Sequence, residues 1–140
     1  MRIYVDGGTH KSRICVVDQS NNFENVKTRK GNPTNNELEY LALLYALSYI
    51  HTAKIHARQI IILTDSKLMA NQMNDKWRIT NEKLAKLNGK CKRMMLPNIR
   101  IKWISRKRNK AGFILDKMKQ MDYYKTVSYT HLTLPTNREV

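Results

Sequence analysis

The spacing of apolar and polar residues along the chain predicts five short strands. They are residues 3–6, 13–18, 23–27, 60–63 and 99–104. The first ends at Gly7-Gly8, typical of a tight turn, and the run DQSNN separates the next two, so the first three strands predict an antiparallel meander. Residues 60–63 are continuously apolar and bounded by polar residues, which indicates a buried central strand.

Apolar residues at helical spacing predict four helices. The first begins after Thr34, a residue suited to cap it, and the others cover residues 66–73, 81–95 and 110–124. The order of elements is βββαβααβα, which predicts an α/β fold with helices packed on a five-stranded mixed sheet.

The length of the chain is that of a single domain, and we place that domain at residues 1–126. The stretch VSYTHLTLPT breaks the preceding pattern and resembles the translation of a sequencing-library adapter. We therefore expect residues 127–140 to be a non-native tail, which would point to an environmental or fragmentary assembly as the source.

The chain is strongly basic. It has 26 Lys and Arg residues and 11 Asp and Glu residues, for a formal net charge of +15. Thirteen of these cations fall between Lys76 and Lys110, where Glu82 is the single acid. So one-sided a field predicts a polyanionic partner, nucleic acid before membrane.

Cys15 and Cys91 have no partner-like spacing, and we expect free thiols in a reducing compartment. The first residues enter a strand pattern without the apolar run of a signal peptide, and no stretch is long enough to span a bilayer. We therefore expect a soluble, cytoplasmic protein without a membrane partner, and a monomer.

The few carboxylates lie at informative places. Asp6 and Asp65 each stand at the C-terminal end of a predicted strand, where ligand sites of α/β sheets gather. Glu37 and Glu39 point about 200° apart on one helix, so one of them faces the sheet. Glu39 lies one turn from Ala42 in the apolar stripe, whereas Glu37 suits the helix dipole, although Glu37 also neighbours Leu41. Acids gathered at central strands indicate a bound cation.

Three motifs, YVDGG, TNNELEYLALLYAL and ILTDSKLM, resemble those of the type 1 ribonuclease H family in order and spacing. The resemblance extends from residue 2 to about residue 120, and each motif alone is weak. It implies the ribonuclease H-like fold, with Asp6, Glu39 and Asp65 as metal-binding catalytic acids.

The chemistry that the resemblance implies is hydrolysis of the RNA strand of an RNA–DNA hybrid, with products that carry 5′ phosphates. Two Mg²⁺ or Mn²⁺ ions would flank the scissile phosphate, since carboxylate ligands suit these ions. Gly7, Asn35 and Asn36 match positions that contact RNA 2′-hydroxyls in the family, and capping of the helix is an equally compatible role for the two Asn residues.

Two departures from the family pattern matter. The segment NDKWRITNE leaves no room for the extra basic helix of many members, and the stretch SRKRNK lacks the histidine that some carry there. None of the four histidines falls near a motif, so acid–base work by histidine is not expected. Arg106 or Arg108 would then assist the phosphate.

The fourth acid of the family pattern is also displaced. Its usual register, four residues after Asn109, reaches Phe113, whereas Asp116 lies one helical turn beyond Gly112. We interpret Asp116 as the fourth metal ligand, with Gly112 clearing the path, and a solvated acid paired with Lys119 or Gln120 is the alternative.

Two other functions remain open at this point. One is a non-catalytic module that binds hybrid or double-stranded RNA, favoured if Asp116 cannot reach the metals. The other is a DNA-processing nuclease of the same fold, which the Asn35-Asn36 pair disfavours, because 2′-hydroxyl recognition has no use on DNA.

Overall fold

A five-stranded mixed sheet forms the centre of the fold in the computed structural model, which describes the backbone of residues 1–133 and the side chains of residues 1–127. The strands are β1 (Arg2–Gly8), β2 (Arg13–Asp18), β3 (Phe23–Thr28), β4 (Ile60–Thr64) and β5 (Ile99–Trp103). Their order is β3-β2-β1-β4-β5, with the first three antiparallel and with β1, β4 and β5 parallel to one another. The α/β fold and its five-stranded mixed sheet are thereby confirmed.

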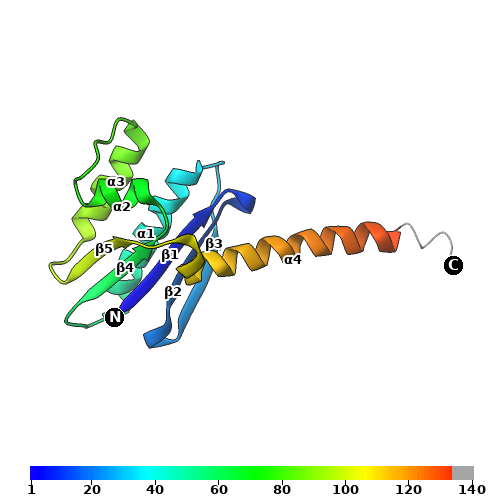
Figure 1. The fold of residues 1–140 in the computed structure, drawn as a ribbon, viewed down its shortest axis with the longest axis horizontal. Helices are drawn as coiled ribbons and strands as arrows, with labels where there is room; N and C mark the ends of the chain where they lie inside the picture. Colours follow the sequence, from blue (N-terminus) through cyan, green and yellow to red (C-terminus); the bar gives the residue numbers. More distant parts are fainter. Residues whose placement is uncertain (134–140) are drawn as a thin grey trace.

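Four α-helices accompany the sheet within the described residues: α1 (Asn35–Thr52), α2 (Lys67–Met73), α3 (Glu82–Met94) and α4 (Lys110–Thr133). Short 3-10 turns cover His10–Ser12, Gln19–Asn21 and Arg106–Arg108. The first three helices lie on one side of the sheet, and α4 crosses the other side and projects well beyond it (Figure 1). No described helix combines the length and the apolar character that crossing a membrane requires.

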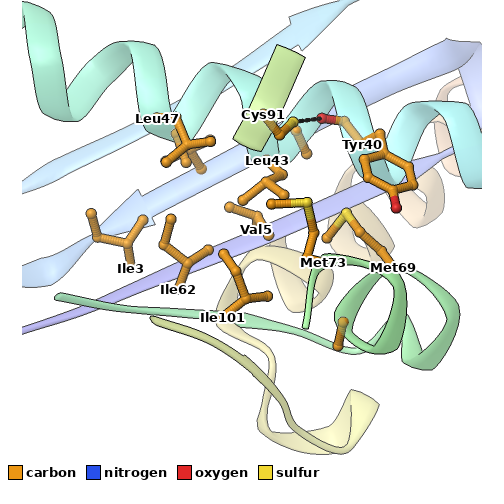
Figure 2. Close-up of a cluster of buried hydrophobic side chains, with 14 of the residues drawn as sticks. Ile3, Val5, Tyr40, Leu43, Leu47, Ile62, Met69, Met73, Cys91 and Ile101 are labelled. Carbon is orange, nitrogen blue, oxygen red and sulfur yellow. Dashed lines mark hydrogen bonds between the residues drawn. The ribbon is translucent and has the colours of Figure 1, made fainter. Parts of the chain in front are cut away.

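The alternation within β1 explains the two layers. Ile3 and Val5 face α1 and join the larger core, where they pack with Leu43 and Ile62 (Figure 2). Tyr4, between them, faces α4 and joins the smaller core around Leu115. Because successive strand residues point to opposite faces, this one segment buries both of its sides.

The two cysteines lie on opposite sides of the sheet. Cys15 of β2 belongs to the core under α4, and Cys91 of α3 belongs to the core around α1, where its thiol approaches the Tyr40 carbonyl (Figure 2). Both are free and fully buried, and burial raises the pKa of each thiol to about 12.

The predicted C-terminal end of α4 was wrong. The helix does not stop at Tyr124 but continues to Thr133. The sequence has no glycine or proline between Gly112 and Pro135, and extending an existing helix costs far less than starting one. The remainder of the expected tail, residues 134–140, lies outside the described residues.

Candidate active site

Three carboxylates meet at one edge of the sheet. Asp6 lies in β1, Asp65 directly follows β4, and Glu39 lies in the second turn of α1. Because β1 and β4 are adjacent and parallel, their carboxyl ends reach the same edge, as do ligand sites in other α/β sheets. One carboxylate oxygen from each of the three residues lies within 4.8 Å of the others.

Glu39 lies close to β1 because Gly7 has no side chain. A Cβ at Gly7 would stand 2.4 Å from the carbonyl carbon of Leu38, so only glycine lets α1 approach so closely. At this contact the Gly7 amide donates a hydrogen bond of 2.7 Å to Glu39 Oε1. Glu37 instead closes a capping box with Thr34 and stays at the surface.

Asn109, the N-cap of α4, links the elements that carry the acids. Its amide nitrogen donates to the Val5 carbonyl and to Asp65 Oδ2, both at 2.9 Å. Its oxygen accepts from the amides of Ala111 and Gly112. No role for Asn109 was predicted from the sequence. Its position just before a helical pattern is the signal that identifies an N-cap.

Arg106 brings a cation into the middle of the cluster. Its Nη1 lies 3.4 Å from both oxygens of Asp6 and 3.1 Å from Asp65 Oδ2. Its Nη2 donates to Asp116 Oδ1 at 2.9 Å. The guanidinium therefore links Asp116 to Asp6 and Asp65, and Asp116 pairs with Arg106 rather than with Lys119 or Gln120.

Burial dominates the electrostatics of the cluster. Asp6 and Glu39 are 1% and 4% exposed, and burial raises the pKa of each carboxyl. The charge of Asp65 raises the pKa of Asp6 further, while Arg106 acts in the opposite direction. Clustered carboxylates of this kind need a compensating cation to remain ionised.

A cavity of about 310 Å³ opens over the acids. Asp6, Glu39, Asp65 and Asp116 line it, and Arg106, Gly7, Asn35, His10, Arg13 and Lys119 complete much of its wall. The presence of His10 corrects the expectation that no histidine lies near the site. His10 follows Asp6 by four residues in the sequence, and the short turn after β1 places it in the wall of the cavity.

Asp122 of α4 anchors this turn. Its carboxylate accepts from Arg13 Nη1 at 2.7 Å and pairs with His10 and Lys11 at 3.2 and 3.3 Å. The hydrogen bond from Arg13 is the largest of the effects that lower the pKa of Asp122 to about 2. A single acid thus holds three cationic or titratable side chains beside the cavity.

Two of the predicted substrate contacts, Arg108 and Asn36, lie apart from the acids. Arg108 lines the opposite side of the sheet, with Tyr4 and Ile104, and not the cavity over the carboxylates. Asn36 is exposed beside Asn35, and neither caps α1, because Thr34 does so. Between α2 and α3, the part of NDKWRITNE that precedes Glu82 forms no α-helix, and Trp77 is 49% exposed there.

Comparison with known proteins shows the family of the chain. The reverse transcriptase-like family matches residues 5–119. A bifunctional protein of Mycobacterium tuberculosis is 30% identical over 98 residues, which are 69% of this chain and 26% of that protein. The chain therefore spans about a quarter of the length of the curated relatives that it matches.

Solved structures share the fold. The N-terminal ribonuclease H domain of the M. tuberculosis protein, solved as a fusion with maltose-binding protein, superposes with a TM-score of 0.66 and 26% identity, covering 86% of this chain and 96% of that one. A type 1 ribonuclease H solved in complex with an RNA/DNA hybrid gives a TM-score of 0.65 at 24% identity, covering 78% of this chain and 88% of that one.

Proposed function

The chain belongs to the reverse transcriptase-like family, among the type 1 ribonucleases H whose fold it shares, and on this premise we propose that it hydrolyses the RNA strand of RNA–DNA hybrids with two divalent cations. The observation that carries the proposal is the meeting of Asp6, Glu39 and Asp65 within 4.8 Å at the edge of the sheet. The similar protein that was solved with an RNA/DNA hybrid supports this choice of substrate.

The residues present fit a pair of hard cations. All of the donors are carboxylate oxygens, two of the three side chains are almost fully buried, and Mg²⁺ or Mn²⁺ prefers such ligands. Asp6, Glu39 and Asp65 would hold the ions, with Asp116 as the fourth ligand on the water side. Bound divalent cations would supply activation of the attacking water and stabilisation of the leaving 3′ oxygen.

The neighbouring residues keep these acids in position. Gly7 fixes Glu39 through its amide, and Asn109 fixes Asp65 while it caps α4. Both contacts restrict rotation of a carboxylate, which lowers the entropic cost of arranging ligands around a phosphate. Arg106 lines the same cavity and would neutralise charge that develops on the phosphate oxygens.

Substrate recognition would fall to the rim of the cavity. Asn35 lines it and is free of a capping role, so its amide is available to the 2′-hydroxyl of RNA. Gly7 lies at the same place and offers close backbone approach. Cations between Lys76 and Lys110 would bind phosphates and make the affinity for hybrid strongly dependent on salt, apart from Lys107 and Arg108, which lie on the opposite side of the sheet.

The test incubates purified protein with labelled RNA–DNA hybrid, duplex RNA and duplex DNA, each with Mg²⁺, Mn²⁺ or EDTA. We expect cleavage of the RNA strand of the hybrid, with 5′-phosphate ends, that EDTA abolishes. Cleavage that persists in EDTA, or that is equal on duplex DNA, would refute the proposal. The second result would favour the DNA-processing nuclease.

Asp65→Asn separates an enzyme from a binding module. The variant keeps an oxygen for Asn109 but loses the charge that a cation needs, so cleavage should fall by at least about 100-fold. Hybrid binding, measured by fluorescence anisotropy, should stay near the wild-type level because the basic surface is unchanged. Hybrid binding by a wild-type protein that cleaves nothing would support the non-catalytic module instead.

A further inference from the structure

The guanidinium of Arg106 occupies an unusual place, because it touches carboxylate oxygens of three different acids. Nη1 contacts Asp6 and Asp65 at 3.1–3.4 Å, and Nη2 contacts Asp116 at 2.9 Å. Asp6 and Asp65 are two of the three acids that could hold a metal ion. One side chain thus uses the oxygens that a divalent cation would use.

We propose that Arg106 is an internal competitor of the divalent cations, a cationic latch that must leave the carboxylates before the ions are fully bound. This inference rests on the proposed function, since it concerns the same acids. It assigns Arg106 a role in cation affinity that is separate from contact with the phosphate.

Simple electrostatics favours competition over joint occupancy. A monocation already compensates part of the charge of the acids, and a divalent cation brought against the same oxygens would be repelled by the guanidinium at contact distances of a few ångströms. Two ligands that exclude each other from shared atoms reduce each other's affinity by the same factor. Cation binding should therefore release Arg106, and loss of Arg106 should strengthen cation binding.

The surroundings permit such a release. Arg106 lies in the 3-10 turn Arg106–Arg108, and its side chain is 52% exposed, so it can turn away from the carboxylates without opening a core. Gly112 lies close to this contact, because a Cβ there would stand 3.4 Å from Nη1 and 3.3 Å from Asp6 Oδ2, which is tighter than ordinary van der Waals contact. The absence of a side chain at Gly112 therefore leaves room for the guanidinium beside Asp6 and Asp65.

The experiment measures cation affinity directly, by calorimetric titration of Mn²⁺ into EDTA-stripped, desalted protein. Arg106→Gln removes the charge and keeps a shorter, polar side chain, and Arg106→Ala removes both the charge and the polar group. Lys107→Ala is the matched control, because Lys107 lies in the same turn but lines the opposite side of the sheet. We expect Arg106→Gln to bind Mn²⁺ roughly tenfold more tightly than wild type, within the usual range of coupling between sites.

A second readout follows the arginine itself. The NMR signal of the Arg106 Nε–H group should shift on titration with diamagnetic Mg²⁺ and follow the same saturation curve as the calorimetry. Circular dichroism checks that each variant is folded. If Arg106→Ala does not fold, Arg106→Gln alone tests the proposal.

The outcomes are distinguishable from those of the hydrolysis assay. Equal or weaker Mn²⁺ binding by Arg106→Gln, or an equal gain in Lys107→Ala, overturns the latch. Tighter binding by Arg106→Gln supports it, even if wild-type protein fails to cleave hybrid, a result that would refute only the proposed function. Cleavage of hybrid with unchanged Mn²⁺ affinity in Arg106→Gln would leave the function standing and remove the latch.

Discussion

Gly7→Ala is the sharpest perturbation of the contact between β1 and α1. The added methyl would stand 2.4 Å from the Leu38 carbonyl carbon, 2.5 Å from its oxygen and 2.8 Å from the Glu39 nitrogen. The first distance is about 1 Å short of the contact distance of two carbon atoms. All three atoms are backbone, so no side-chain rotation relieves the overlap, and α1 must move away from the sheet.

The expected cost is at the upper end of that for overpacked cores, about 3 kcal/mol of unfolding free energy. For a chain of this length, such a loss corresponds to a fall in melting temperature of about 10 °C. The same movement lengthens the 2.7 Å hydrogen bond between the Gly7 amide and Glu39, so hybrid cleavage should also fall at temperatures at which the variant is folded.

Gly8→Ala is the matched control, one residue further along the same strand. A Cβ there meets only Leu115 Cδ1, at 4.0 Å, which is ordinary van der Waals contact. Thermal denaturation followed by circular dichroism and urea titration compares the two variants with wild type. A Gly7→Ala protein that melts within about 2 °C of Gly8→Ala would show that the close approach of α1 is not required.

Three further predictions address individual side chains. Asp116→Asn should reduce hybrid cleavage by about tenfold or more if Asp116 is the fourth ligand, whereas undiminished cleavage would show that three acids suffice. Asn109→Asp keeps the oxygen that caps α4 but replaces the amide that donates to Asp65, so urea titration should show a loss of about 2 kcal/mol, and unchanged stability would contradict the link. The pKa of Asp122 is lowered from 3.8 to about 2, chiefly by Arg13, so its ionised form stabilises the fold above pH 4 and this contribution is lost as the pH falls toward 2. The melting temperature of wild type should accordingly exceed that of Asp122→Asn at pH 6, by a difference that shrinks between pH 4 and pH 2; a constant difference would refute this account.

Local patterns predicted much of the fold, because they follow from short-range physics. The alternation from Ile3 to Asp6 predicted the first strand, and Thr34 was predicted as the cap of the helix that begins at the next residue. The end of α4 was wrong because a helix that projects from the body needs no apolar period to persist. Composition alone does not reveal which part of a helix is packed.

The site residues that lie in sequence motifs were predictable, and those that loops bring to the site were not. Asp6, Glu39 and Asp65 lie at strand ends or in a helical stripe, so their meeting follows from the order of elements. His10 enters the cavity through a turn in which Lys11 has a φ of 57°, a conformation that no simple pattern indicates. Arg106 was selected by its charge, but its contact with three acids depends on tertiary placement.

The two buried thiols make the protein its own reporter of internal motion. Cys15 lies under α4 and Cys91 lies among the other three helices, and with pKa values raised to about 12 neither reacts at neutral pH while it stays covered. Alkylation of each thiol would therefore proceed only through opening of its own layer. Two separate rates would mean that the face carrying α4 loosens independently of the face carrying α1, and one shared rate would mean that the sheet and all of its helices open as a single cooperative unit.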